Sequence, residues 1–128
     1  MRRLGILFLL LAFAGGARAA DPPTQKFVVF FQEWSAAMDE TALSVVTQAA
    51  DWAKAHPGDM VRVNGFASSV GSKAANVLLA DLRAQLVADQ LVADGIDAKR
   101  IRQRGRGPVQ FAMSAQEGRR VEISVTRR

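Results

Sequence analysis

The segment from Gly65 to Arg83, GFASSVGSKAANVLLADLR, holds residue types that can bind an anion. Ser68 and Ser69 lie in a bend of small residues, and Ser72 is the expected N-cap of the helix that follows. Backbone N–H groups and the positive end of the helix dipole would meet at this bend, which favours a bound carboxylate. The segment therefore predicts an anion site at the start of a helix.

Arg83 lies where the helix pattern calls for an apolar side chain. With about 100° per residue, Arg83 and Asn76 fall inside a continuous apolar arc of the helix. The arc otherwise consists of Leu79, Ala80, Leu82, Ala84, Leu86, Val87 and Leu91. A buried guanidinium without partners is costly, so the position requires an explanation. Either Arg83 reaches water or a carboxylate such as Glu122, or it holds an anion beside the N–H groups of the serine bend. Periodicity alone leaves both interpretations open.

The elements that must position this segment follow from hydrophobic periodicity and capping residues. In chain order, the pattern predicts strands over 26–31, 60–64, 100–104 and 120–126, with helices over 40–56 and 73–94 between the first three. The first strand is apolar on both faces and is therefore expected in the centre of a sheet. Each crossover is long enough to connect parallel neighbours with the helix on one face. We therefore expect an α+β fold: a βαβαβ-β sandwich with a mixed four-stranded sheet and two long helices packed on one face.

The N-terminus has the pattern of a secretory signal peptide. Two arginines precede an apolar run over 4–14, and the small residues at 17–19 predict cleavage after Ala19 or Ala20. We expect a signal peptide over 1–20, an extended lead-in over 21–25 and a single domain over 26–126, located in the periplasm. The mature chain contains no second candidate for a transmembrane segment.

The basic excess of the mature chain is modest and lies late in the sequence. The leader contains three arginines and no acid, so its removal lowers the net charge from +5 to +2. Much of the remainder lies at Lys99, Arg100, Arg102, Arg104, Arg106, Arg119, Arg120, Arg127 and Arg128. Such a tract could contact nucleic acid or anionic lipid. Because an exported protein meets little nucleic acid and most of these arginines have no interleaved aromatic residue, we expect a solvated basic face and no nucleic-acid partner.

The residues offer little for enzymatic chemistry. The chain has no cysteine and one histidine, His56, which is expected to lie near the last carbonyls of the first helix. The sequence shows no carboxylate pair, nucleophile elbow or metal-ligand cluster, so we expect a non-enzymatic protein without metal or cofactor. Trp52 is expected in the core or at its rim. Trp34 is expected either near the anion site or as a cap on the core.

The segment that begins at Gly65 resembles the signature of OmpA-like domains. That signature reads G-H-T-D, then G-S, then N-x-x-L-S-x-x-R-A, and the chain supplies Gly65, Gly71, Ser72, Asn76, Leu79, Arg83 and Ala84 at the matching positions. The sequence VVFFQEWSAAMDETA before it, and LVADGIDAKRI, GRGP and RRVEI after it, also fit the family pattern. The resemblance covers nearly the whole mature chain.

The resemblance implies binding of the diaminopimelate side chain of the peptidoglycan stem peptide. In that family the motif aspartate takes the ligand's ammonium, and the motif arginine, here Arg83, takes its carboxylate. One fixed charge of each sign suits a zwitterion, and a planar guanidinium can grip a carboxylate with two hydrogen bonds. The ligand-binding residues expected on this basis are Arg83, Ser68, Ser69, Asn76 and Phe66.

The chain departs from the family pattern around the implied ligand. Ser68 replaces the aspartate, Phe66 the histidine, Ala67 a threonine, Ala80 a serine and Gly118 an asparagine. Loss of the carboxylate is expected to weaken binding by about a hundredfold or more. One hypothesis is a peptidoglycan binder with a degenerate site. The alternative is an envelope protein–protein module that has lost peptidoglycan binding.

Overall fold

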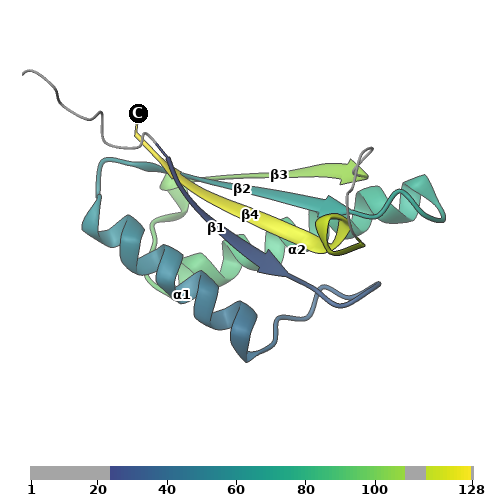
Figure 1. The fold of residues 1–128 in the computed structure, drawn as a ribbon. Helices are drawn as coiled ribbons and strands as arrows, with labels where there is room; N and C mark the ends of the chain where they lie inside the picture. The colour runs from purple at the N-terminus through teal and green to yellow at the C-terminus, as the bar shows by residue number, and fades with distance from the viewer. Residues whose placement is uncertain (1–23, 109–114, 128) are drawn as a thin grey trace, which may run out of the picture.

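The computed structural model describes residues 24–108 and 115–127 (Figure 1). Its main elements are β1 (Thr24–Phe30), α1 (Glu40–Ala55), β2 (Met60–Ala67), α2 (Lys73–Ala93), β3 (Ile101–Pro108) and β4 (Arg120–Thr126), with short 3₁₀ helices η1 (Ala98–Arg100) and η2 (Ala115–Arg119). The predicted signal peptide and residues 21–23 of the lead-in lie outside the described residues. The rest of the lead-in, Thr24 and Gln25, belongs to β1.

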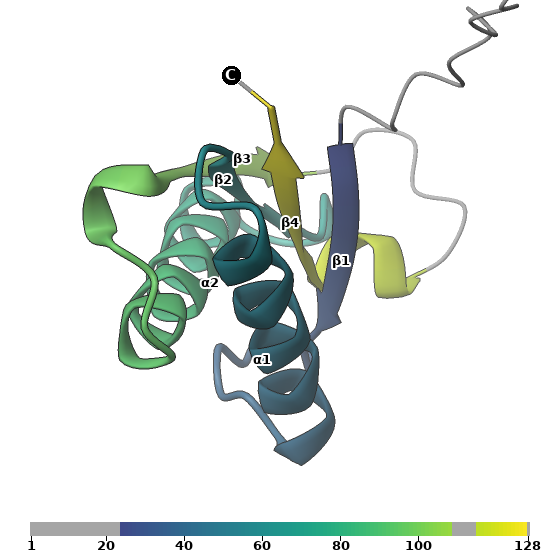
Figure 2. The same cartoon turned by 90° about the vertical axis from the view of Figure 1, so that its left-hand side faces the viewer.

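The four strands form one mixed sheet in the order β1-β4-β2-β3. Strand β3 runs parallel to β2, whereas β4 runs antiparallel to both β1 and β2. Both long helices cover the same face of this sheet, and no described helix covers the opposite, open face (Figure 2). The predicted α+β fold is therefore confirmed, including the βαβ crossover between the parallel neighbours β2 and β3.

The predicted central position of the first strand is wrong, because β1 lies at the edge of the sheet and pairs only with β4. Its apolar residues do occupy both faces: Val29 is fully buried toward the helices, whereas Phe30 is 49% exposed. The strand therefore places an aromatic ring on the open face. The alternating last strand, β4, takes a central position, where one face meets the core and the residues of the other face are half-buried except for buried Ser124.

Strands β2 and β3 extend further than predicted. Strand β2 continues through Gly65 to Ala67, and β3 continues through Gly105 to Pro108, with a register irregularity between Gly65 and Phe66. Gly65 faces α2 so closely that a Cβ there would lie 2.2 Å from the carbonyl oxygen of Ala80. A glycine within a strand is often where another backbone approaches, and here the glycine allows the strand to continue beneath the helix.

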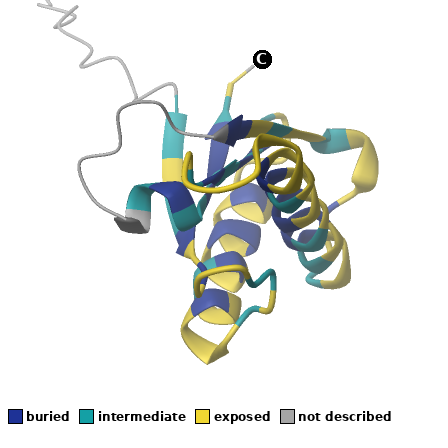
Figure 3. Ribbon diagram, turned by 90° about the vertical axis from the view of Figure 1, so that its right-hand side faces the viewer, coloured by how far each residue is buried: buried dark blue, intermediate teal, exposed yellow. Residues whose placement is uncertain are grey.

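The core lies between the helices and the sheet (Figure 3). Its sheet side is formed by valines and Ile123, and its helix side mainly by alanines. On α1, Leu43 is 37% exposed. Leu82 on α2 is likewise 48% exposed. No helix among the described residues is long and apolar enough to cross a membrane.

Candidate ligand pocket at the start of helix α2

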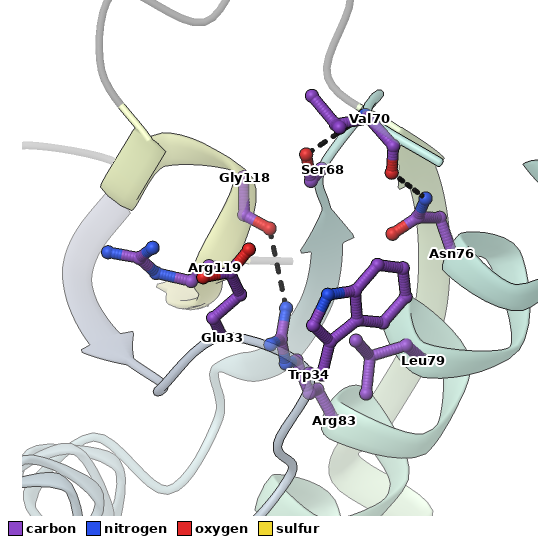
Figure 4. Close-up of a pocket in the computed structure, with 9 residues that line it drawn as sticks. All are labelled: Glu33, Trp34, Ser68, Val70, Asn76, Leu79, Arg83, Gly118 and Arg119. Atoms are coloured by element: carbon purple, nitrogen blue, oxygen red, sulfur yellow. Dashed lines mark hydrogen bonds between the residues drawn. The ribbon is translucent and has the colours of Figure 1, made fainter. Parts of the chain in front are cut away.

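A pocket of about 170 Å³ lies where three loops meet the first turns of α2 (Figure 4). The β1–α1 loop contributes Glu33 and Trp34, the β2–α2 loop contributes Ser68 and Val70, α2 contributes Asn76, Leu79 and Arg83, and η2 contributes Gly118 and Arg119. Drug-sized ligands occupy pockets of about 300–1,000 Å³. This pocket therefore suits the end of one side chain rather than a sugar.

Arg83 lies at the base of the pocket and connects its three walls. Nε donates to the carbonyl of Ser35 at 2.8 Å, and Nη2 donates to that of Gln32 at 3.0 Å. Nη1 donates to the carbonyls of Phe66 at 3.2 Å and Gly118 at 3.3 Å. A guanidinium has five N–H donors, so four bonds leave one N–H of Nη2 for a ligand. The side chain thus ties together the β1–α1 loop, the end of β2 and η2.

Arg83 is also a buried positive charge. Its residue is 1% exposed, and the described residues place no carboxylate within salt-bridge distance of its guanidinium. Burial, and to a smaller extent repulsion from Arg119, lowers the pKa of Arg83 from its ordinary value to about 10. The group therefore stays charged at neutral pH. Glu122 does not neutralise it, because that carboxylate pairs with Lys26 and Arg120 instead. The interpretation in which Arg83 reaches Glu122 is therefore wrong.

Asn76 shapes the serine bend. Its side-chain amide donates to the carbonyls of Val70 at 2.8 Å and Ser72 at 3.0 Å, and the residue is 1% exposed. The Ser72 hydroxyl accepts from the N–H of Ala75, which confirms Ser72 as the N-cap of α2. The predicted apolar arc therefore does contain Asn76 and Arg83 as buried polar residues. In the described structure Asn76 positions the loop that forms one wall of the pocket.

Trp34 lies over the pocket in an unusual backbone conformation. Its φ is +54°, and it is the one non-glycine residue with a positive φ among those described. The residue is 55% exposed, and its indole approaches Gly71 so closely that a Cβ there would lie 3.5 Å from the ring. Strained conformations of this kind concentrate at functional sites. The position left open by the sequence is therefore resolved: Trp34 lines the pocket.

Glu33 and Arg119 are pocket residues that the sequence did not indicate. Glu33 is exposed, and its carboxylate lies beside Gly118 and Arg119 in Figure 4. Arg119 has a buried Nε–H that finds no hydrogen-bond acceptor in the described structure. One feature of the sequence could have indicated Glu33: it directly precedes Trp34, for which a position near the anion site was one of the two expectations. Nevertheless, only the folded loops bring Glu33 and Ser68 to the same pocket.

The predicted site residues do not all gather at the pocket. Arg83, Asn76 and Ser68 line it, and the Ser68 hydroxyl accepts from the N–H of Val70 at 3.0 Å. Ser69 is exposed and is not among the lining residues. The side chain of Phe66 faces a groove on the open face of the sheet, because β2 continues through this residue. Phe66 thus contributes its carbonyl, but not its ring, to the surroundings of Arg83.

The other singled-out residues fall outside the pocket. His56 lies at the end of α1, as expected, where its Nδ1 is 2.8 Å from the carbonyl oxygen of Trp52. Trp52 is 39% exposed and stacks on His56, so it belongs to the rim rather than the core. The described residues hold no group of three or more metal-ligating side chains.

The chain belongs to the OmpA family, whose family model matches residues 30–123. Among curated proteins, it is 36% identical over 104 residues to the probable lipoprotein YiaD of Escherichia coli, covering 77% of this chain and 48% of that protein. It is 39% identical over 87 residues to the peptidoglycan-binding protein ArfA of Mycobacterium tuberculosis, covering 63% of this chain and 27% of that protein. The chain therefore spans about half or less of these relatives.

Solved structures agree with the fold. The OmpA-like domain of FopA1 from Francisella tularensis superposes with a TM-score of 0.72 and 25% identity, over 81% of this chain and 73% of that chain. The peptidoglycan-associated lipoprotein from Burkholderia pseudomallei gives a TM-score of 0.70 and 20% identity, over 78% and 90% of the two chains. The second likeness supports the fold alone.

Proposed function

We propose that this protein is a non-enzymatic, peptidoglycan-associated protein of the periplasm. Its pocket would take a zwitterionic end of the stem peptide, such as that of diaminopimelate. One observation carries the proposal: the buried cation Arg83 lies at the base of a small pocket, and no described carboxylate lies within salt-bridge distance of its guanidinium. A ligand carboxylate would supply the missing negative charge in a site of low dielectric constant.

The ligand carboxylate would be held by positive charge from Arg83 and Arg119. Among the described residues, one N–H of Arg83 has no acceptor, and the buried Nε–H of Arg119 likewise finds none. Both donors belong to cations, and hydrogen bonds from ionised donors are about twice as strong as neutral ones. Arg83 would thus act on the ligand mainly through its charge, because most of its donors already hold the loops.

Glu33 would take the ligand's ammonium in place of the family aspartate. Ser68, at the aspartate position, has only a hydroxyl, and that oxygen already accepts from Val70. Glu33 lines the same pocket and makes no ion pair with any described residue. A carboxylate from the β1–α1 loop would therefore restore the second charge that a zwitterion requires.

A sacculus-binding assay with diaminopimelate as competitor tests this proposal. Glu33→Gln removes the carboxylate and is expected to weaken retention on purified sacculi by about 10–100-fold. Adding Ser68→Asp to that variant is expected to restore much of the loss, because it returns a carboxylate to the other wall. Asp51→Asn removes the same charge from an exposed position on α1 and serves as the control.

Two results would count against the proposal. Equal retention of the wild type, Glu33→Gln and Asp51→Asn would show that Glu33 takes no part in the binding. No retention of the wild type, together with recovery of a crosslinked protein partner in the periplasm, would favour the alternative of an envelope interaction module.

A further inference from the structure

The open face of the sheet carries more positive charge than the late arginines alone predict. Alternate residues of β3 point away from α2, and the register of the parallel pair places Arg62 of β2 beside Arg102 and Asn64 beside Arg104. Together with Arg106, Phe66 and Glu122, these residues line a groove of about 330 Å³ on this face. Arg62, from the middle of the chain, therefore lies on the same face as the late arginines of β3.

Little within the fold neutralises this charge. The face holds six cations: Lys26, Arg62, Arg102, Arg104, Arg106 and Arg120. Its one acid in the groove, Glu122, pairs with Lys26 at 3.7 Å and with Arg120 at 3.4 Å. The other four arginines make no ion pair with any described residue, and the segment 109–114 contains no acidic residue. Like charges directly opposite each other across strands are destabilising, so this arrangement lowers stability unless a partner supplies anions.

We infer that this face, the arginine face, binds the phosphate groups of an anionic lipid surface. Its cations lie across neighbouring strands of one sheet, and all of them except the largely buried Arg120 are exposed, as an extended charged surface requires. Phe30, which pairs with Arg120 across β1 and β4, adds a half-exposed aromatic ring to the same face. Surfaces that combine basic residues with apolar rings are typical of proteins that lie on membranes. The expected location of the chain in the envelope places such lipids within reach.

The arrangement fits a nucleic acid less well. Binding to single strands relies on aromatic rings that are free to stack on bases. The ring of Phe66, the aromatic residue of the groove, is already covered by the guanidinium of Arg120 at 4.1 Å. The contacts available to a partner are therefore mostly charge contacts, as between arginines and lipid phosphates.

Vesicle co-sedimentation tests this inference with the protein purified without its predicted signal peptide. Phosphatidylglycerol vesicles are compared with phosphatidylcholine vesicles. Because each basic residue near an anionic surface contributes about fivefold in affinity, the double variant R104Q/R106Q is expected to bind phosphatidylglycerol about 30-fold more weakly. The double variant K54Q/K73Q lowers the charge equally but lies on the helices, and it is expected to bind like the wild type.

The inference would be overturned if the wild type did not prefer phosphatidylglycerol, or if both double variants lost the same affinity. Binding of the wild type to single-stranded DNA but not to vesicles would assign the face to another partner and would also overturn it. Circular dichroism of each variant shows that the fold is kept. Because neither Glu33 nor Ser68 lies on the arginine face, this result is independent of the sacculus assay.

Discussion

Replacing Arg83 by methionine is expected to destabilise the fold itself, and not only to weaken ligand binding. The substitution keeps an apolar stem but removes four hydrogen bonds, to the carbonyls of Gln32, Ser35, Phe66 and Gly118. Each bond contributes about 0.5–1.5 kcal/mol net, and a buried carbonyl left without a donor costs about 1–3 kcal/mol. Relief from burying a charge offsets part of this loss. The expected net loss is about 3–5 kcal/mol, which is a large part of the roughly 5–15 kcal/mol that stabilises a typical domain.

Urea and thermal unfolding, followed by circular dichroism, measure this effect. For a domain of this size about 1 kcal/mol shifts the midpoint by 4–8 °C, so Arg83→Met is expected to lower the Tm by roughly 15–30 °C. Arg106→Met replaces an exposed arginine and is expected to change the free energy of unfolding by less than about 0.5 kcal/mol. If Arg83→Met were as stable as Arg106→Met, the four carbonyl bonds would not hold the loops together. The destabilisation also means that loss of sacculus binding by an Arg83 variant cannot by itself identify a ligand contact.

The contribution of Arg83 to stability is expected to be independent of pH near neutrality. Burial lowers its pKa from the ordinary value of arginine to about 10, so the folded state disfavours the charged form. Because a base with a lowered pKa in the folded state binds fewer protons when folded, this cost to stability is fully present below about pH 10 and is relieved only as the pH rises above that value. The difference in unfolding free energy between the wild type and Arg83→Met should therefore be constant between about pH 6 and pH 9. If this difference in unfolding free energy changed with pH in that range, the protonation of another group would be coupled to Arg83.

Two further substitutions test how the motif positions the pocket. Gly65→Ala would place a Cβ 2.2 Å from the carbonyl oxygen of Ala80, so it is expected to destabilise the domain by about 1–3 kcal/mol in urea unfolding. Gly58→Ala, where nothing lies within 4 Å of the added Cβ, is the matched control, and equal effects would contradict the close approach. Asn76→Ala removes two hydrogen bonds from the loop carbonyls and is expected to cost about 1–3 kcal/mol. It should also speed amide exchange at Val70, and unchanged exchange would show that Asn76 does not order the loop.

Local patterns were sufficient to predict most of the elements of this fold. Helical periodicity identified α1 and α2, the capping residue Ser72 marked the start of α2, and strand-length apolar runs identified the strands. The order of the strands was harder, because it depends on pairing between distant segments. The apolar residues of β1 favoured a central strand, yet β4 pairs between β1 and β2 and leaves β1 at the edge. A pattern within one strand records which faces are apolar, but not which strand lies beside it.

The candidate site could be predicted only in the part that lies on one helix. Asn76 and Arg83 were found because a regular helix fixes which residues share a face, and both are buried there. Phe66 was misplaced because β2 continues beyond its predicted end, which turns its side chain to the open face. Glu33 and Arg119 were missed because they come from loops far apart in the sequence. Their meeting depends on tertiary structure, which no local spacing records.

The bonds of Arg83 change what the substitution at Ser68 implies. If the arginine served only a ligand, loss of the partner aspartate would leave a buried cation without a purpose, and it would be open to replacement. In this fold Arg83 holds three loops through backbone carbonyls, so a structural requirement maintains the cation whatever residue occupies position 68. If the pocket binds a zwitterion as proposed, its positive half is therefore retained by folding, and only its negative half can vary. A carboxylate on any wall of the pocket would complete the site, and Glu33 is the acidic residue that the described structure places there.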